Sequence, residues 1–291
     1  DVGGDASVEI TEELRHELNK LYGFDKPLYE RYFRWIGNVL IGEFGESYEY
    51  KEPVIKVIVN CFPVSLTFGL WSFMLVYLLS IPLGVYKAVH DGSSFDALSS
   101  FLLFAAYSIP NYALAIVLIV FFGGGSFWEL FPIQGMHRDG AEGLATTAYI
   151  LDYLHHVVLP LTCYIIGQFA LLTMLMKNSF LEQISQDYVR TARAKGLSHK
   201  MVYLKHVLRN ALIPIATGIG QYTAIFLMGS ILLEKIFGLE GIGLLNYESI
   251  LARDYPVVWA IIMLASLATV VGNFISDMLY IIIDPRISLE K

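Results

Sequence analysis

The chain has 291 residues, of which 55% are hydrophobic and 16% charged, and its formal net charge is −7. This composition is too apolar for a soluble domain of that length, because one aqueous core could not bury so much apolar surface. The negative charge argues against a nucleic-acid partner. The two cysteines, Cys61 and Cys163, stand far apart and indicate neither a disulfide framework nor a metal site.

The N-terminal part, residues 1–61, is predicted to be an extracytoplasmic segment with amphipathic helices. Thr11 can cap a first helix that stops at Gly23. Pro27 can start a second helix with an aromatic-rich face suited to the lipid interface or to packing on the spans. That face contains Leu28, Tyr32, Trp35, Ile36 and Val39. Two roles stay open for the segment: a structural cap on the bundle, or a contact with an external partner.

Residues 62–291 are predicted to form the transmembrane domain. Five apolar segments are long enough to cross a bilayer, which takes about 20 residues. They are Phe62–Tyr86, Ala97–Phe122, His155–Met176, Ala211–Leu233 and Val257–Ile283.

Lysine and arginine in the connections predict the orientation of these spans. Between Asp187 and Pro214 the chain carries six cations, whereas Gly123–Leu154 has only Arg138. We therefore expect a cytoplasmic loop at about 178–209, with residues 1–61 and the connections after the second and fourth spans outside. Five spans that begin outside imply an earlier sixth span, and the absence of an initial methionine agrees with this.

The cytoplasmic loop has signals for two helices joined by a corner. Residues 186–195 favour a helix, Gly196 can end it in the left-handed conformation, and Ser198 can cap the next helix. An apolar stripe is expected to continue along Met201, Leu204, Leu208 and Leu212. From these residues alone, the loop is either a charged element that fixes topology and touches lipid phosphates, or a helix that docks in a groove of a cytoplasmic subunit.

The order of residues in this loop resembles a known signature. RTARAKG at 190–196, followed by HVLRNALIP at 206–214, is similar to the cytoplasmic loop of binding-protein-dependent ABC importer permeases of the dipeptide, oligopeptide and nickel family. Arg190, Thr191 and Ala192 stand where the general pattern has Glu-Ala-Ala, and Arg209 stands near its proline. Further similarity includes GEFGESYEYKEPV at 42–54 and the YGFDKP, FGLWS and LTMLMKNSF segments, and it is greatest to the first permease subunit of Yej-type importers.

The resemblance implies an all-α integral membrane protein of the bacterial cytoplasmic (inner) membrane, a type I ABC importer permease bundle. It implies a heterodimer with a second homologous permease, two cytoplasmic ATPase subunits and a periplasmic peptide-binding protein. Oligopeptides, including microcin C-like peptides, would enter by ATP-driven alternating access. ATP and Mg²⁺ would be bound by the partners, with no cofactor on this chain. The ATPase-coupling residues would be Asp187, Arg190, Thr191, Ala192, Arg193, Lys195, Gly196, Ser198 and Met201.

Catalytic motifs are absent from the sequence, including the phosphate-binding GxxxxGK[ST] loop, HExxH and GxSxG. No catalytic residue and no metal ligand is therefore assigned, and ATP has to be bound elsewhere. A secondary transporter, or another membrane protein not coupled to ATP, is the alternative. It would be expected to carry more ionisable residues at mid-membrane than Asp277 alone.

Two further groups of residues are candidates for contact with cargo or partners. Polar side chains within the spans either make interhelical hydrogen bonds or line a translocation path: Asn111, Gln168, Gln221, Asn273 and Asp277. A glycine-rich acidic loop either contacts the binding protein or only shapes a re-entrant turn: Gly238, Glu240, Gly241, Gly243, Glu248 and Asp254.

Overall fold

The computed structural model describes residues 26–124 and 127–283, without the side chains of residues 221–228, 280 and 283. The helix expected at 11–23 lies outside this part. The described elements are α2 (Leu28–Leu40), α3 (Val54–Val89), α4 (Ser94–Ser108), α5 (Asn111–Phe122), η1 (Ala141–Gly143), α6 (Thr146–Ile184), α7 (Asp187–Ala194), α8 (His199–Met201), η2 (Val202–Val207), α9 (Leu208–Ala211), α10 (Ile213–Met228), α11 (Ile231–Ile236), α12 (Ile242–Leu251) and α13 (Tyr255–Ile283).

Three of these helices, α3, α6 and α13, are long and apolar enough to cross a membrane. Two of them begin earlier than the sequence indicated, α3 at Val54 after Pro53 and α6 at Thr146. The boundary expected at residue 62 therefore falls inside a helix, and residues 178–184 of the expected loop belong to α6. The prediction of an all-α membrane bundle is confirmed.

The second expected span, Ala97–Phe122, is not one straight helix. It consists of α4 and α5, which meet at an angle of 98°. The break follows from Pro110, because a proline disfavours the helical conformation in the residue before it. Ile109 is accordingly extended, with φ −87° and ψ 120°.

The fourth expected span, Ala211–Leu233, is also interrupted. Helix α10 has 16 residues, fewer than the roughly 20 of a full crossing. Gly229 follows it with φ 58°, a left-handed conformation that ends a helix and suits glycine. Ser230 is extended, and the chain then turns into the short helix α11.

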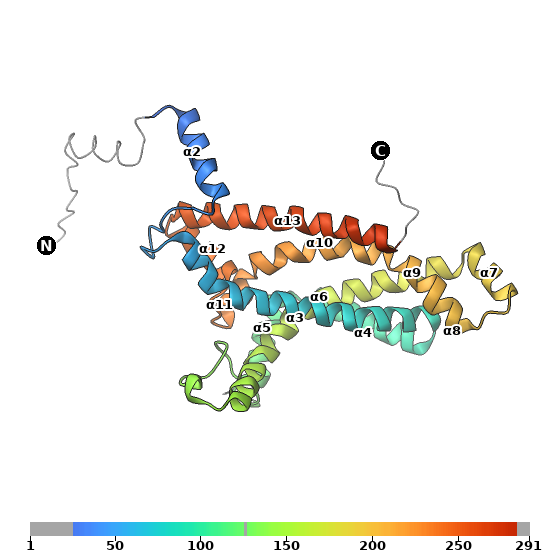
Figure 1. Cartoon of the computed structure of the whole chain (residues 1–291). Helices are drawn as coiled ribbons and strands as arrows, with labels where there is room; N and C mark the ends of the chain where they lie inside the picture. The colour runs from blue at the N-terminus through green and yellow to red at the C-terminus, as the bar shows by residue number, and fades with distance from the viewer. Residues whose placement is uncertain (1–25, 125–126, 284–291) are drawn as a thin grey trace, which may run out of the picture.

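The bundle is built from two closely packed helix pairs, α3 with α6 and α10 with α13 (Figure 1). Glycines allow the close approach in each pair. A Cβ atom at Gly84 of α3 would lie 2.6 Å from the Cβ of Met176 on α6. In the other pair Gly220 packs directly on the backbone of Gly272. Small residues at such contacts are typical of membrane helices, which gain from van der Waals packing rather than from a hydrophobic effect.

The connections gather at two ends of the bundle, which we name the α7 end and the α12 end (Figure 1). At the α7 end, Lys177 of α6 pairs with Asp91 in the turn between α3 and α4. At the α12 end, Gly135 in the connection after α5 donates to the carbonyl oxygen of Phe237 at 2.9 Å. The alternation of connections expected from the sequence is therefore present in the fold.

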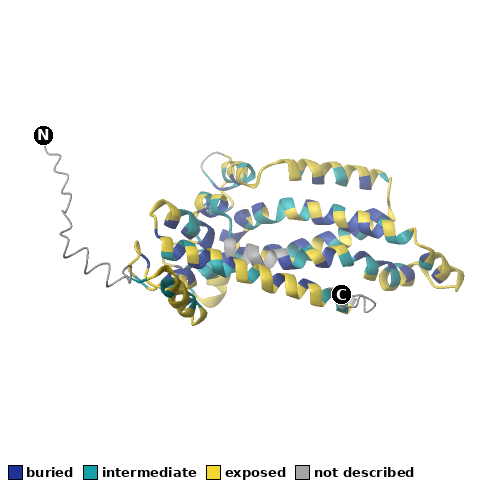
Figure 2. Cartoon of the chain, turned by 90° about the horizontal axis from the view of Figure 1, so that it is seen from above, coloured by how far each residue is buried: buried dark blue, intermediate teal, exposed yellow. Residues whose placement is uncertain are grey.

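Buried side chains lie between the helices and exposed ones cover the outward faces (Figure 2). Many of the exposed side chains are large and apolar, such as Phe101 on α4 and Val270 on α13, at 68% and 65% exposure. An aqueous surface would not carry such faces, so lipid or a second membrane subunit covers them.

The contact at Gly84 gives a test of the α3–α6 packing. The change Gly84→Ala places a methyl group 2.6 Å from the Cβ of Met176 and 2.8 Å from the Thr173 carbonyl oxygen. It should lower the free energy of unfolding by about 1–3 kcal/mol through overpacking. Thermal unfolding in detergent measures the loss. Gly167→Ala on α6 is the matched control, because its methyl group meets only Asn111 at 3.5 Å. Equal melting temperatures for the two variants would contradict the close contact.

Candidate functional site

The α7 end carries a short helix, α7, that is fastened to the bundle along one side. Val189 and Ala192 are buried, at 1% and 8% exposure, and join an apolar cluster with Phe180 of α6 and Ala88 of α3. The side chains of Asp187, Arg190, Thr191 and Arg193 on α7 are exposed. Of the residues expected to couple to an ATPase, Ala192 therefore anchors the helix, and its exposed neighbours are available to a partner.

The corner after α7 has the geometry that the sequence predicts. Gly196 is left-handed, with φ 80°. Its N–H donates to the Arg193 carbonyl oxygen at 2.9 Å, and the Leu197 N–H donates to the Ala192 carbonyl oxygen at 3.4 Å. These are the two bonds of a Schellman cap, which leaves few carbonyl groups at the helix end unpaired. Ser198 then caps α8 by accepting from the Met201 N–H at 3.4 Å.

The apolar stripe expected after the corner is present only in its second half, where Leu208 and Leu212 are half-buried and pack on the core. Val202, Val207 and Ala211 are fully buried, whereas Met201 and Leu204 are 48% and 53% exposed. The cause is the π-helical turn η2 at Val202–Val207, in which the buried positions are five residues apart. The expected spacing assumed a regular α-helix throughout. As a result, Met201 and Leu204 add an exposed apolar strip beside the charged α7.

A side-chain contact braces the corner across its two arms. The Arg193 guanidinium donates to the Tyr203 hydroxyl at 3.2 Å and lies 5.8 Å from the centre of its ring. Tyr203 in turn packs edge-on against Phe180 of α6, with ring centres 5.9 Å apart. Both arms are thus connected to α6, and α7 projects from the bundle as a braced element.

Beneath this corner lies a network of buried charges. The Asp96 carboxylate at the start of α4 accepts from Lys177 at 2.7 Å and lies 3.0 Å from the Lys87 ammonium. Lys87 has no exposed surface and also donates to the hydroxyl groups of Ser99 and Ser100, at 2.5 and 2.9 Å. Lys177 additionally pairs with Asp91 at 2.8 Å. The network therefore ties α3, α4 and α6 together where the cationic loop begins.

At the α12 end a buried carboxylate, that of Asp254, holds the segment before α3. It accepts hydrogen bonds from the Ser47 hydroxyl and from the N–H groups of Tyr48 and Glu49, the latter two at 3.1 and 3.3 Å. Asp254 has no exposed surface. In this conformation its role is therefore to tie the N-terminal segment to the start of α13, and its side chain is not available to a partner.

A second carboxylate, that of Glu234, organises the glycine-rich loop. It is fully buried and accepts from the N–H groups of Ser230 and Leu244, at 3.0 and 2.7 Å. Burial raises the pKa of this carboxyl, although its hydrogen bonds oppose the shift. A Cβ atom at Gly241 would lie 2.5 Å from its Cδ. Gly241 and Gly243 are buried around this carboxylate. Their burial agrees with the second role considered for this loop, in which its glycines only shape a re-entrant turn.

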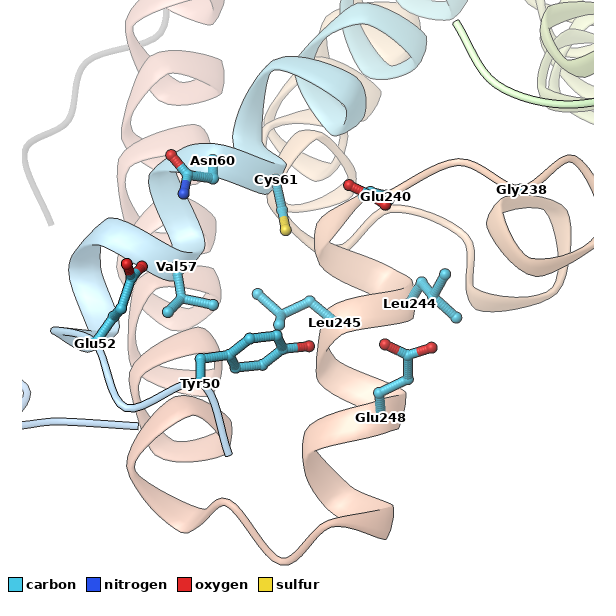
Figure 3. Close-up of a pocket in the computed structure, with 11 residues that line it drawn as sticks. Tyr50, Glu52, Val57, Asn60, Cys61, Gly238, Glu240, Leu244, Leu245 and Glu248 are labelled. Atoms are coloured by element: carbon cyan, nitrogen blue, oxygen red, sulfur yellow. The ribbon is translucent and has the colours of Figure 1, made fainter. Parts of the chain in front are cut away.

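Other residues of this loop surround a pocket of about 450 Å³. Figure 3 shows the carboxylates of Glu240 and Glu248 and the hydroxyl of Tyr50 directed toward one space between the loop and the start of α3. Burial raises the pKa of Tyr50, and the Glu248 charge adds to this. Gly238 and Gly241 also line the pocket, together with residues that the sequence did not single out: Tyr50, Glu52, Val57, Asn60, Cys61, Leu244 and Leu245.

The polar residues expected within the spans lie on different helices. Asn111 at the start of α5 lies against Gly167 of α6, next to Gln168. Asn273 and Asp277 are one helical turn apart on α13 and are both exposed. Gln221 lies in α10, and its side chain is outside the described part. No local sequence signal singled out the two buried carboxylates: Glu234 only precedes three glycines, and Asp254 only follows Arg253.

Comparison with known families agrees with this architecture. Residues 80–289 match the family model of the binding-protein-dependent transport system inner membrane component. This match covers most of the chain, including the network, the corner and the glycine-rich loop. The protein belongs to this family of inner-membrane ABC importer permeases, and the predicted multi-pass inner-membrane location is confirmed.

Individual relatives agree with the family assignment. The chain is 44% identical to the inner membrane ABC transporter permease protein YejB of Escherichia coli O157:H7, over 96% of this chain and 77% of that protein. It is 42% identical to the peptidoglycan transport system permease protein YejB of Agrobacterium fabrum, with the same coverage. It is 38% identical to the oligopeptide transport system permease protein AppB of Bacillus subtilis, over 96% of this chain and 86% of that protein. The predicted resemblance to Yej-type peptide permeases is confirmed.

The charge network predicts a large cost for removing one partner. Lys177→Met leaves Asp91 and Asp96 without a shared cation, and it should lower the free energy of unfolding by about 3–5 kcal/mol. Lys56→Met is the matched control, because Lys56 pairs with Glu52 on the surface and should cost less than about 1 kcal/mol. Thermal unfolding of both variants in detergent makes the comparison. A loss for Lys177→Met as small as that of the control would refute the assigned role.

Proposed function

We propose that this chain is the permease subunit of an importer that moves oligopeptides into the cytoplasm by ATP-driven alternating access. The observation that carries the proposal is the braced corner at Gly196, which presents an exposed charged helix beside exposed Met201 and Leu204. A loop that served only to fix topology would not need a capped corner. A rigid handle, in contrast, can transmit the movement of an attached subunit to the spans.

The α7 end would face the cytoplasm, because its connections carry the excess of lysine and arginine. Two ATPase subunits would bind beneath the membrane, one on this chain and one on its partner permease, and would hold ATP and Mg²⁺. Their docking surface here would be the exposed positions of the expected set: Asp187, Arg190, Thr191, Arg193, Lys195, Gly196, Ser198 and Met201.

A second, homologous permease would cover part of the exposed apolar surface. Asp277 and Asn273 support this placement, because ionisable and polar side chains on membrane helices normally face a bundle interior or a hydrated path. In the isolated subunit both are exposed on an otherwise apolar helix. They would therefore lie at the interface or along the translocation path, together with Asn111 and Gln168.

The α12 end would receive the peptide-binding protein in the periplasm. Its exposed acidic residues, Glu240 and Glu248, line the pocket together with Gly238. They could contact a basic surface of the binding protein or the ammonium terminus of an arriving peptide. Of the six candidates in this loop, these three are the ones we propose for the contact, since Gly241, Gly243 and Asp254 are buried.

The proposed cargo is an oligopeptide, with microcin C-like peptides as a narrower possibility. Support comes from the relatives, one of which is named for oligopeptide transport. Another is named for peptidoglycan transport, so peptides derived from the cell wall are the cargo to compare. A separate binding protein would make most of the selection.

The corner can be tested with Gly196→Asp. The left-handed backbone disfavours any side chain by about 1–2 kcal/mol, so the substitution should distort the cap. In proteoliposomes containing the complete transporter, peptide uptake should fall about fivefold or more, the size of a lost coupling between sites. ATP hydrolysis should no longer respond to peptide-loaded binding protein.

The matched control is Gly143→Asp, which makes the same substitution at the α12 end, where a Cβ atom meets nothing within 4 Å. It should transport normally. Full peptide uptake by Gly196→Asp would overturn the coupling role.

Copurification is a separate check: the second permease and two ATPase subunits should accompany this chain, whereas a carrier not coupled to ATP would purify and transport alone.

The cargo is tested by the ATPase activity of the reconstituted complex. Binding protein loaded with oligopeptides should stimulate hydrolysis, and unloaded protein should stimulate it less. Muropeptides and microcin C-like peptides are compared at equal concentration. Stimulation by muropeptides alone would replace the oligopeptide assignment, and stimulation by none of these compounds would refute a peptide cargo.

A further inference from the structure

Helix α2 is amphipathic along its whole length. With about 100° of rotation per residue, its apolar side chains fall within one arc of about 160°. This arc contains Leu28, Tyr29, Tyr32, Phe33, Trp35, Ile36, Val39 and Leu40. The opposite side contains Lys26, Glu30, Arg31, Arg34 and Asn38. Four of the eight apolar side chains are aromatic, and the three tyrosine and tryptophan side chains among them have a polar group at one end.

The apolar face of α2 is not used in the fold of this chain. No residue of α2 is buried. Tyr29, Phe33 and Leu40 are 68%, 68% and 81% exposed. A helix with this face would be unfavourable in water, so another surface has to cover it.

The position of α2 is restricted by the segment that follows it. Ser47, Tyr48 and Glu49 bind the Asp254 carboxylate at the start of α13, and an antiparallel bridge joins Glu46 to Pro53 at the start of α3. Figure 1 shows α2 leaving this attachment across the direction of α13 rather than along it. The helix is therefore held at the height where two membrane-crossing helices begin, and it extends sideways from them.

This height coincides with aromatic side chains of the kind found at membrane–water boundaries. Tyr255 and Trp259, in the first turns of α13, are 58% and 56% exposed. Tyrosine and tryptophan are enriched at such boundaries because their rings favour the headgroup region. Beyond them α13 continues with an exposed apolar face, so the surface of the bilayer lies close to the level of α2.

The charged side of α2 is suited to the same environment. Glu30 accepts from Lys26 at 2.7 Å and from Arg34 at 3.3 Å, each one helical turn away. This ladder leaves an excess of positive charge on the side away from the apolar arc. Cationic side chains there can contact lipid phosphates while the opposite arc enters the acyl boundary.

We propose that α2 is an interfacial helix that lies on the bilayer surface at the α12 end, with its aromatic arc in the lipid. The occupant of its exposed face is thus phospholipid at the boundary between headgroups and acyl chains. Attached through Asp254 to α13, the helix would hold the start of that span at a constant depth. A docked protein partner and packing on the bundle are the competing occupants, and the experiment distinguishes them.

The test uses a fluorescent label on single cysteines in the complete transporter, reconstituted in nanodiscs. The background is Cys61→Ser with Cys163→Ala. Tyr29→Cys places the label in the aromatic arc, and Asn38→Cys, on the polar side, is the matched control. Lipids with a quencher near the top of the acyl chain should quench the label at position 29 severalfold more strongly than the label at position 38. The emission of the former should also be shifted to shorter wavelength.

Each other outcome contradicts the proposal. Equal, weak quenching at both positions means that lipid does not cover the arc. Weak quenching at position 29 that changes when binding protein is added identifies a protein partner instead. Weak quenching at position 29 with blue-shifted emission, both with and without binding protein, identifies packing on the bundle. If the labelled variants do not assemble, brominated lipids can quench tryptophan directly, and the unlabelled transporter should lose more emission than its Trp35→Phe variant.

Discussion

The α7 end depends on the ion pairs that the buried Asp96 carboxylate makes. Burying a charge away from water is costly unless partners of opposite charge and hydrogen bonds surround it. Lys87 and Lys177 supply those partners from two other helices, at 3.0 and 2.7 Å. Because the cost of leaving any one of them unpaired is high, the ends of α3, α4 and α6 are held in one arrangement, and the cationic loop begins from this common base.

The opposite end follows the same physical rule with different groups. Glu234 and Asp254 are fully buried carboxylates whose partners include backbone N–H groups. Glu234 closes its own loop by accepting from Leu244, whereas Asp254 joins the start of α13 to the segment before α3. Between the two ends the helices pack closely at Gly84 and Gly220, and the Gly220 N–H also donates to the Ser276 hydroxyl at 2.8 Å.

Local features of the cationic loop after α6 were predictable because they depend on short-range geometry. Gly196 and Ser198 have the conformation and capping roles expected from their residue types. The apolar stripe through Met201 and Leu204 was not predictable, since a π-helical turn of one extra residue displaces it. Similarly, Pro110 predicted an irregularity in the second span, but the residue type alone could not predict the 98° angle between the two helices.

By itself the sequence determined the membrane class, the alternation of connections, the cationic loop and the family, because composition, charge distribution and motif order are properties of the chain alone. Only the tertiary structure decided which polar residues are structural. Asp254 and Glu234 looked like other acidic residues of an exposed loop. In the fold, Ser47 comes to Asp254 from the N-terminal segment, and the loop turns so that the Leu244 N–H reaches Glu234. The reason is that burial and pairing depend on contacts between distant segments, which no local pattern records.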